Sequence, residues 1–435
     1  MRITMICLGS TGDVKPYIIL GRELQRRGHQ IVITAFSDFQ QAVEQEGMGF
    51  RPISGDVRAF MANIMKPGVT GITYLNQVRN TIKPIVHPFL DSLVEGCDGA
   101  ECVIATFFGQ IFRSVAEMKR LPFIQTQYFL MDKNAQAPVA SAPGQRVGRM
   151  WNVASYQLAY LLISTLEKYY LDDWRKEHGL PPRRLERDAS YEMNGHIIPV
   201  LYAISPLVVP RPAAWGANIH KTGYWVDEHP VEYTPDEKLL AFLEEGEKPI
   251  YVGFGSMVSG DMGETLQIVL EAIRLSGVRA VIAKGWGNAT IPDLPNVYVA
   301  GYVPHEWLLP KVRGVVHHGG AGTLAAGILA GQPTLVIPFG GDQFFWGERV
   351  RQLGIGPNPI PRERLSAAKL AKAIEQLVSE KRYRVAAKEL GMRLKTEDGV
   401  VNAADVIEHE LRKWLRMEGR PAVLVPHHTL PPKES

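Results

Sequence analysis

The fold is decided by the run Ile3-Thr-Met-Ile-Cys-Leu8 and by the turn after it, Gly9-Ser-Thr-Gly-Asp13. A short, almost wholly apolar run of this kind is typical of a strand buried on both faces of a sheet. Residues 17–27 follow as an amphipathic segment that ends in Arg26-Arg27-Gly28, which predicts a helix and its C-terminal cap. Residues 31–36 form a second strand-like run. Because strand, helix and strand alternate, the sequence predicts an α/β fold with a parallel sheet.

The same alternation returns after a proline-rich break at Pro206, Pro210 and Pro212. The later strand-like runs are residues 250–253, 280–283, 297–300, 314–317 and 334–338. The chain therefore reads as two similar α/β halves without a short-period repeat. We expect a first domain over residues 1–205, a connection over 206–224, a second domain over 225–399, and a helix and tail over 400–435.

Length and composition agree with two domains and exclude several classes of protein. The chain has 435 residues, too many for one ordinary core, and 46% of them are hydrophobic, which excludes disorder. Lys and Arg (48) nearly balance Asp and Glu (45), so a nucleic-acid partner is not expected. Three cysteines make no disulfide framework, and no apolar stretch reaches the ~18–20 residues of a spanning helix. The sequence predicts a cytoplasmic protein.

Asp13 lies in the turn after the first strand, and ligands of parallel α/β sheets bind at the carboxyl ends of strands. Two interpretations of this residue are open. Asp13 could be the N-cap of a helix that begins near Val14. It could instead be a carboxylate that faces a substrate hydroxyl and acts as a general base.

The turn His317-His-Gly-Gly-Ala-Gly-Thr323 joins a buried strand to a helix predicted from Leu324. Its glycines allow backbone amides to approach an anion, and the helix N-terminus adds positive potential. His318 and Thr323 can add side-chain donors, so the turn suits a pyrophosphate. The alternative is a tight structural turn whose histidines bind backbone groups.

Asp342 and Gln343 follow the last predicted strand, where a carboxylate and an amide could hold the vicinal hydroxyls of a sugar. The alternative is a helix start capped by Asp342. Gly255 and Ser256 form a weaker candidate turn in the same cleft. No Asp-x-Asp, His-Glu-x-x-His or Gly-x-Ser-x-Gly motif occurs, and the dinucleotide fingerprint is absent. Chemistry without a metal on a nucleotide-linked substrate is the expectation.

Taken together, these motifs resemble the two-domain inverting glycosyltransferases of the GT-B fold. The resemblance is greatest to the sterol 3-β-glucosyltransferases and their bacterial relatives. It runs nearly end to end, through residues 9–17, 252–257, 285–287, 303–308 and, most specifically, 315–361. It implies two Rossmann-like domains that face a central cleft, the first binding the acceptor and the second the nucleotide sugar. It also implies a C-terminal helix that crosses back to the first domain.

The resemblance further implies transfer of a hexose, with glucose expected, from a UDP-sugar to an acceptor hydroxyl, with inversion and without a metal or cofactor. Asp13 matches the catalytic base, and Val303 matches the backbone contact to the uracil edge. Ala326 stands where plant enzymes have a ribose-binding Glu, which leaves UDP and dTDP both open. The aromatic partner of the base is Trp286, Tyr302 or Trp307. The expected donor-binding residues are Gly12, Gly255, Ser256, Trp286, Val303, Trp307, His318, Gly320, Ala321, Gly322, Thr323, Asp342 and Gln343.

Apolar residues in the first half suggest a large apolar acceptor such as a sterol, a triterpenoid or a polyphenol, although ordinary core is the alternative. The expected acceptor-binding residues are Phe107, Phe108, Tyr128 and Phe129. The helix carrying Arg412-Lys-Trp-Leu-Arg416 could make a weak peripheral contact with an anionic membrane. Two other functions stay open, namely a sugar-nucleotide epimerase of the same fold and a transferase of dTDP-sugars to an antibiotic-like acceptor.

Overall fold

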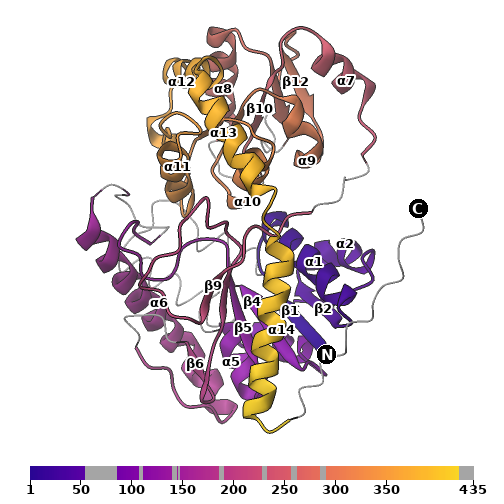
Figure 1. The fold of residues 1–435 in the computed structure, drawn as a ribbon, viewed down its shortest axis with the longest axis vertical. Helices are drawn as coiled ribbons and strands as arrows, with labels where there is room; N and C mark the ends of the chain where they lie inside the picture. The colour runs from indigo at the N-terminus through magenta and orange to yellow at the C-terminus, as the bar shows by residue number, and fades with distance from the viewer. Residues whose placement is uncertain are drawn as a thin grey trace.

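The computed structural model describes residues 1–53, 86–106, 111–139, 145, 147–185, 191–227, 233–255, 262–284 and 291–420. Two parallel sheets, each flanked by helices, lie one above the other along the long axis of the molecule (Figure 1). The predicted fold class is thereby confirmed. Phe107, Phe108, Ser256 and Trp286 lie outside the described residues.

The N-terminal sheet has seven strands in the order β3-β2-β1-β4-β5-β8-β9, and every neighbouring pair is parallel. Its strands are β1 (Arg2–Ile6), β2 (Gln30–Ala35), β3 (Gly49–Pro52), β4 (Cys102–Thr106), β5 (Phe123–Gln127), β8 (Val200–Tyr202) and β9 (Ile219–Lys221). The described helices of this half include α1 (Thr11–Arg26), α2 (Gln40–Glu44), α5 (Ile111–Met118) and α6 (Arg149–Glu177), and residues 86–96 are also helical. A small antiparallel hairpin, β6 (Glu192–Met193) and β7 (His196–Ile197), stands apart from the sheet. Because β1 lies inside the sheet, between β2 and β4, the turn after it is at an inner position of the sheet's carboxyl edge.

The C-terminal sheet has five parallel strands in the order β12-β11-β10-β13-β14. They are β10 (Ile250–Gly253), β11 (Ala280–Ala283), β12 (Val297–Ala300), β13 (Val315–His317) and β14 (Thr334–Val336). The helices are α7 (Glu237–Glu244), α8 (Met262–Ser276), α9 (His305–Leu308), α10 (Ala321–Leu329), α11 (Gln343–Gln352), α12 (Ala367–Ser379) and α13 (Lys381–Leu394). Here β10 and β13 are central, so the turns after them share the middle of this sheet's carboxyl edge.

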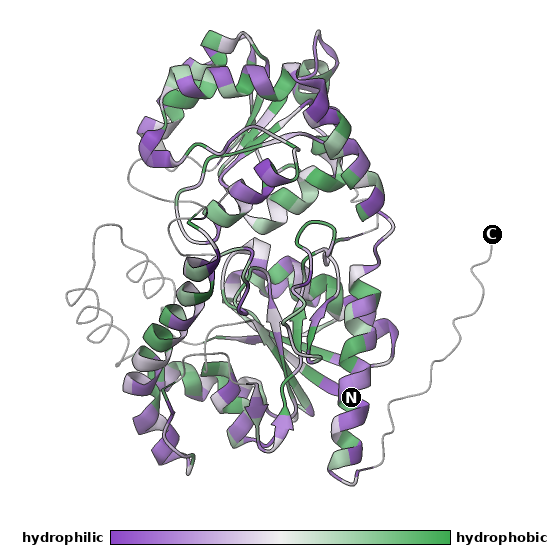
Figure 2. Ribbon diagram, turned by 60° about the vertical axis from the view of Figure 1, so that its left-hand side comes forward, coloured by the Kyte–Doolittle hydropathy of each residue, from purple (hydrophilic) through white to green (hydrophobic). Residues whose placement is uncertain are grey.

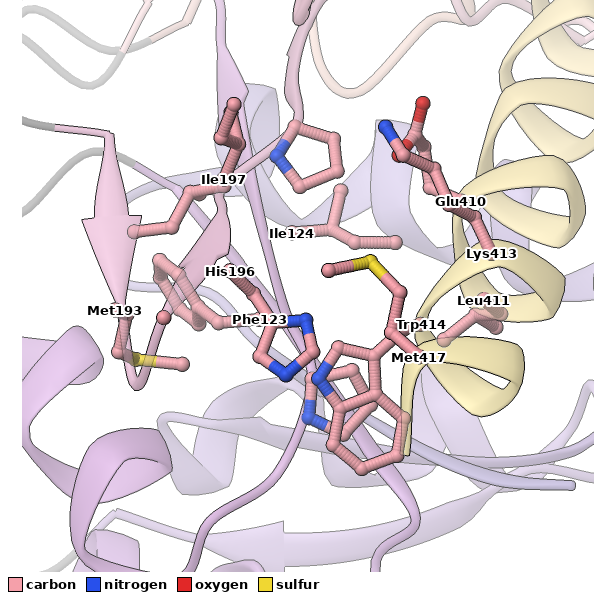
Figure 3. A pocket seen from close by; sticks show the side chains of 14 residues that line it. Phe123, Ile124, Met193, His196, Ile197, Glu410, Leu411, Lys413, Trp414 and Met417 are labelled. Carbon is pink, nitrogen blue, oxygen red and sulfur yellow. The ribbon is translucent and has the colours of Figure 1, made fainter. Parts of the chain in front are cut away.

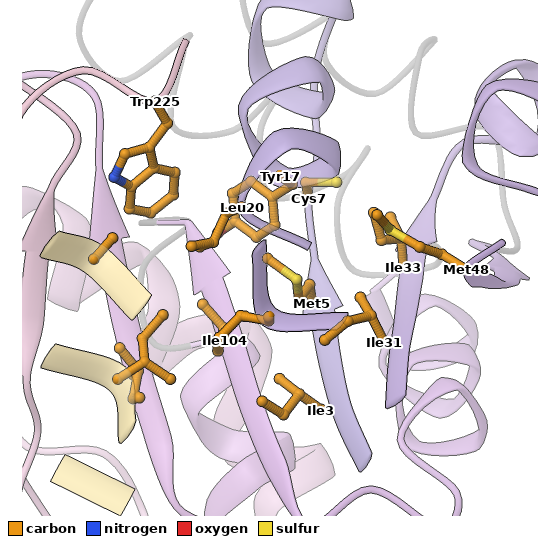
Figure 4. Packing of buried hydrophobic residues seen from close by; sticks show 14 of the residues in the cluster. Ile3, Met5, Cys7, Tyr17, Leu20, Ile31, Ile33, Met48, Ile104 and Trp225 are labelled. Atoms are coloured by element: carbon orange, nitrogen blue, oxygen red, sulfur yellow. The ribbon is translucent and has the colours of Figure 1, made fainter. Parts of the chain in front are cut away.

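The last described helix, α14 (Gly399–Met417), returns to the N-terminal half and packs against α1 (Figure 1). Ala403, Ile407 and Leu411 of α14 join the core formed by β1, β2 and α1, part of which Figure 4 shows. Arg27 at the end of α1 binds Asp405 at 2.6 Å. The expected crossing of the C-terminal helix is thus confirmed, and this helix completes the core of the first half.

The two crossings between the halves touch each other backbone to backbone. A Cβ on Gly399 would lie 2.2 Å from the carbonyl oxygen of Tyr224, and one on Gly223 would lie 3.0 Å from the Cα of Gly399. The contact therefore requires glycine. β9 (Ile219–Lys221) pairs with β8, so residues 219–221 of the predicted 206–224 connection belong to the first sheet. This strand has three residues and follows a proline-rich stretch, which hid it from a pattern-based prediction.

Helix α6 carries large apolar residues four apart, from Leu158 to Trp174, but they do not form one buried face. Leu158 and Leu162 are 61% and 46% exposed, whereas Trp174 is fully buried. Figure 2 shows hydrophobic and hydrophilic residues interspersed along the helices of both halves. A step of four residues advances about 40° beyond a full helical turn. The stripe of these apolar residues therefore winds around α6, and one flat sheet face cannot cover both of its ends.

Candidate active site

Asp13 is held in the first turn of α1 by the residue that caps this helix. Its Oδ2 accepts hydrogen bonds from the backbone N–H of Ser10 at 2.7 Å and from Ser10 Oγ at 3.1 Å. The helix begins at Thr11, with Ser10 as the N-cap, so the expectation of a start near Val14 with Asp13 as the N-cap was wrong. Asp13 is instead the third helical residue and returns a bond to the cap, as in a capping box.

Gly9 makes this position of Asp13 possible. A Cβ on Gly9 would lie 2.2 Å from Asp13 Oδ2, and the backbone of Gly9 has a φ of +139°. Burial raises the pKa of the Asp13 carboxyl above its usual value, and the two hydrogen bonds from Ser10 partly oppose this shift. The site therefore contains a partly buried carboxylate whose basicity is increased.

Aromatic residues surround the backbone of Asp13. The Tyr128 hydroxyl donates to the Asp13 carbonyl at 3.3 Å, and the Tyr128 ring meets Tyr17 and Trp225 edge-on. Tyr128 was expected to contact the acceptor, and its hydroxyl binds the first turn of α1, which contains Asp13. Phe129, also expected there, is partly buried against one apolar cluster of the N-terminal half and another that residues of both halves form.

The glycine-rich turn after β13 leads directly into α10. His317 Nδ1 accepts from the Gly319 N–H at 3.0 Å, and Gly319 has a φ of +98°. Gly320 is the N-cap, and Ala321, Gly322 and Thr323 form the first turn of α10, three residues before the predicted start at Leu324. The N–H groups of this turn have no partner within an α-helix, so they can bind an anion.

His318 is wedged between the two glycine turns of the C-terminal half. A Cβ on Gly320 would lie 2.5 Å from its Nε2, and one on Gly255 would lie 3.2 Å from its Cε1. Burial lowers the pKa of His318 to about 4, although a hydrogen bond with the backbone of Gly253 opposes the shift. The imidazole is therefore neutral at pH 7 and can act near an anion as a dipole, without a full charge.

Asp342 and Gln343 begin α11, and their side chains are tied to their own loop. Asp342 Oδ2 accepts from Trp346 Nε1 at 2.8 Å, and Gln343 Oε1 accepts from the backbone N–H of Phe339 at 2.8 Å. Burial raises the pKa of Asp342 to about 6, and the charge of Asp13 raises it further. Carboxylates from the two halves thus lie close enough to influence each other electrostatically.

The loop between β12 and α9 carries the candidates for contact with a nucleobase. Tyr302 is 81% exposed, and partly buried Val303 follows it. The Trp307 ring is covered by Lys311 Nζ, 4.2 Å from its centroid, and meets the Tyr233 ring edge-on at 5.1 Å. Trp307, which is also expected to contact the base, thus has ring contacts of its own within the C-terminal half. Of these two candidates, Tyr302 is the more exposed.

An ion pair that the sequence did not suggest joins the two sides of the site. Lys15 Nζ of α1 binds Glu306 Oε1 of α9 at 2.6 Å. The partners are 291 residues apart, so no local spacing reveals them. Their closeness in sequence to expected site residues is a signal that could have identified them. Lys15 follows Asp13 by two residues, and Glu306 follows Val303 by three.

A pocket of about 200 Å³ lies elsewhere, between the β6–β7 hairpin and α14 (Figure 3). It is lined in part by Phe123, Met193 and Trp414. Phe123 begins β5, so the pocket is at the amino edge of the sheet, whereas Asp13 is at the carboxyl edge. Among the described residues, no three His, Cys, Asp or Glu side chains form a metal-binding group. No described helix is long and apolar enough to cross a membrane.

Two family models match the chain, one in each half. Residues 3–135 match the glycosyltransferase family 28 N-terminal domain. Residues 280–398 match the C-terminal domain of the erythromycin biosynthesis protein CIII-like family. The first match contains Asp13 and the second contains the glycine-rich turn, Asp342 and Gln343.

Curated relatives match over almost the whole chain. A sterol 3-beta-glucosyltransferase of Arabidopsis thaliana is 32% identical over 434 residues, covering 94% of this chain and 68% of the relative. A sterol 3-beta-glucosyltransferase of Yarrowia lipolytica is 32% identical over 427 residues, but this chain spans only 29% of its length. Among solved structures, the calicheamicin glycosyltransferase CalG4 has a TM-score of 0.68 at 18% identity, covering 94% of this chain and 98% of that one. This structural likeness concerns the fold alone.

Proposed function

The chain belongs to the family of the sterol 3-beta-glucosyltransferases, and from that premise we propose that it transfers a hexosyl group from a UDP-sugar to a hydroxyl of an apolar acceptor. Glucose is the proposed sugar, and a sterol or a molecule of similar shape is the proposed acceptor. The reaction inverts the anomeric centre and uses neither a metal ion nor a cofactor. Membership of a transferase family also argues against the epimerase alternative.

The observation that carries the proposal is the partly buried carboxylate of Asp13, held by Ser10 at the carboxyl edge of the N-terminal sheet. Its pKa is raised by burial, which makes it a better proton acceptor near neutral pH. In the proposed step, Asp13 takes the proton of the acceptor hydroxyl while that oxygen forms a bond to the anomeric carbon. The bond from this carbon to the diphosphate breaks, and UDP leaves with the electron pair.

The negative charge that develops on the leaving diphosphate is proposed to be stabilised by the N-terminus of α10. Gly320 caps this helix, and Ala321, Gly322 and Thr323 present the amides of its first turn. His318 stays neutral and contributes its dipole. Gly12 and Gly255 allow close approach of the donor from the two sides.

The remaining donor contacts follow from the loops around α10. Asp342 and Gln343 are proposed to exchange part of their bonds within their loop for hydroxyls of the sugar. Tyr302 stacks on the uracil, and Val303 binds its edge. The dTDP-sugar alternative is not favoured, because the relatives above 30% identity are named sterol glucosyltransferases and the antibiotic enzymes share only the fold at 18%.

The test is an acceptor panel with UDP-glucose and dTDP-glucose, read by mass spectrometry with and without EDTA, on the protein and on Asp13→Asn. We expect transfer to a sterol from UDP-glucose that resists EDTA. Asp13→Asn should lower kcat about 10²–10⁴-fold, the range of general-base catalysis, and leave UDP affinity within about twofold. Unchanged kcat in Asp13→Asn would refute the assigned base. A strict metal requirement would refute the role of α10.

A further inference from the structure

The ion pair between Lys15 and Glu306 connects the two halves beside the proposed cleft. Its N–O distance is 2.6 Å, and the two side chains are 39% and 33% exposed. Lys15 holds the pKa of Glu306 below its usual value, against the effect of burial, which acts in the opposite direction. Figure 1 shows α9 at the edge of the C-terminal half that faces α1.

Each partner is rigidly tied to one side of the proposed reaction. Lys15 lies in α1, the helix whose first turn holds Asp13 through Ser10. Glu306 lies in α9, next to His305, whose Nε2 lies 3.1 Å from the hydroxyl of Tyr251 in β10. Glu306 is therefore connected through His305 to β10 of the C-terminal sheet, and along the chain to the loop that contains Tyr302 and Val303.

Apolar residues of both halves pack in one cluster, and two polar contacts also join the halves near the chain crossing. Ser205 Oγ donates to Glu397 at 2.8 Å, and the Arg349 guanidinium donates to the carbonyl of Val208. Together with the contact of Gly223 and Gly399, these bonds fix a pivot. Lys15 and Glu306 make a separate contact, which joins α1 of the first half to α9 of the second.

We propose that the Lys15–Glu306 pair is a latch that keeps the two halves closed over the nucleotide sugar. The proposal rests on the proposed function, because it assigns Lys15 of the acceptor half a part in donor affinity. Lys15 and Glu306 are positioning residues, since they act through the distance between the halves. A ligand that needs the closed form binds more weakly when the closed fraction falls.

The test compares Lys15→Ala, Glu306→Ala, the double alanine variant and the charge swap Lys15→Glu/Glu306→Lys. Each single variant should raise KM for the UDP-sugar, and Kd for UDP by calorimetry, about fivefold, the upper end for a partly exposed pair. Saturating donor restores closure, so kcat should change less than about twofold. The double variant should be no worse than either single variant, and the swap should restore KM to within about twofold.

Lys119→Ala is the matched control, because Lys119 binds Asp98 at 2.7 Å within the N-terminal half. It should leave KM and Kd unchanged. Added NaCl should weaken donor binding to the native protein and have less effect on Lys15→Ala, because salt screens a partly exposed pair. Unchanged KM and Kd in both single variants, or a swap no better than they are, would overturn the latch. If the native protein itself neither binds UDP nor transfers sugar, the proposed function fails instead.

Discussion

Replacing Gly9 by Ala tests whether the position of the Asp13 carboxylate sets the rate. The new Cβ would lie 2.2 Å from Asp13 Oδ2 and 2.5 Å from Asp13 Cγ, whereas 3.0 Å is the limit that real Cβ contacts respect. The carboxylate must therefore move by at least 0.8 Å (3.0 minus 2.2), and by 1.2 Å to reach an ordinary contact at 3.4 Å. A misplacement of about 1 Å can lower a rate about 10²-fold.

We therefore expect Gly9→Ala to lower kcat about 10²-fold. The donor is proposed to bind mainly to the C-terminal half, so Kd for UDP should stay within about threefold. Steady-state kinetics with saturating UDP-glucose and calorimetry with UDP measure the two quantities. Gly148→Ala is the matched control, because Gly148 has a φ of +126° and no neighbour within 4 Å of the added Cβ. This control separates backbone strain from displacement of Asp13.

Two results would refute this reasoning. If Gly9→Ala kept more than about a third of the native kcat, a shift of the Asp13 carboxylate would not affect the rate-limiting step. If Gly148→Ala lost as much activity as Gly9→Ala, backbone strain and not the position of Asp13 would explain the loss.

Two further predictions concern Ser10 and the nucleobase loop. Ser10→Ala removes a hydrogen bond that lowers the pKa of Asp13, so the acid limb of the pH profile of kcat/KM should move to higher pH. Asp13 must be ionised to accept a proton, and activity is therefore lost as the pH falls through its pKa. An acid limb that stays in place would mean that another group titrates. Tyr302→Ala should weaken UDP binding about 2–10-fold in calorimetry, the range of one aromatic stacking contact. Trp307→Ala should mainly lower Tm, because the Trp307 ring packs on Lys311 and Tyr233. The reverse pattern would make Trp307 the stacking partner.

The strands were predictable because each central one is a short apolar run between turn residues, as at Ile3–Leu8 and Gly314–His317. The partner of α14 was not predictable from its residues alone. Its apolar face of Ala403, Ile407 and Leu411 would suit any sheet or helix, and only the resemblance to a family pointed to the first half. β9 was missed because three residues show no alternation, and pairing with β8 makes them a strand.

The positions of the site's loops followed from a general rule, since ligands bind at the carboxyl ends of parallel strands. That rule located Asp13, the glycine-rich turn and Asp342. The side-chain partners within the site depend on distant residues, which local patterns cannot supply. Trp307 looks available in the sequence, but Lys311 and Tyr233 cover its ring, and Lys15 meets Glu306 across 291 residues.

The return of α14 has a consequence for synthesis on the ribosome. The β-strands of the first half are complete at Lys221, but the helix that closes their core ends at Met417, 196 residues later. At about 5–20 residues per second, that interval lasts roughly 10–40 s. During this interval α1 has no α14 to pack against. The core of the first half therefore cannot be completed until the second half has been synthesised. A nascent chain of this protein therefore completes the apolar cluster around β1, β2 and α1 only after α14 has been made.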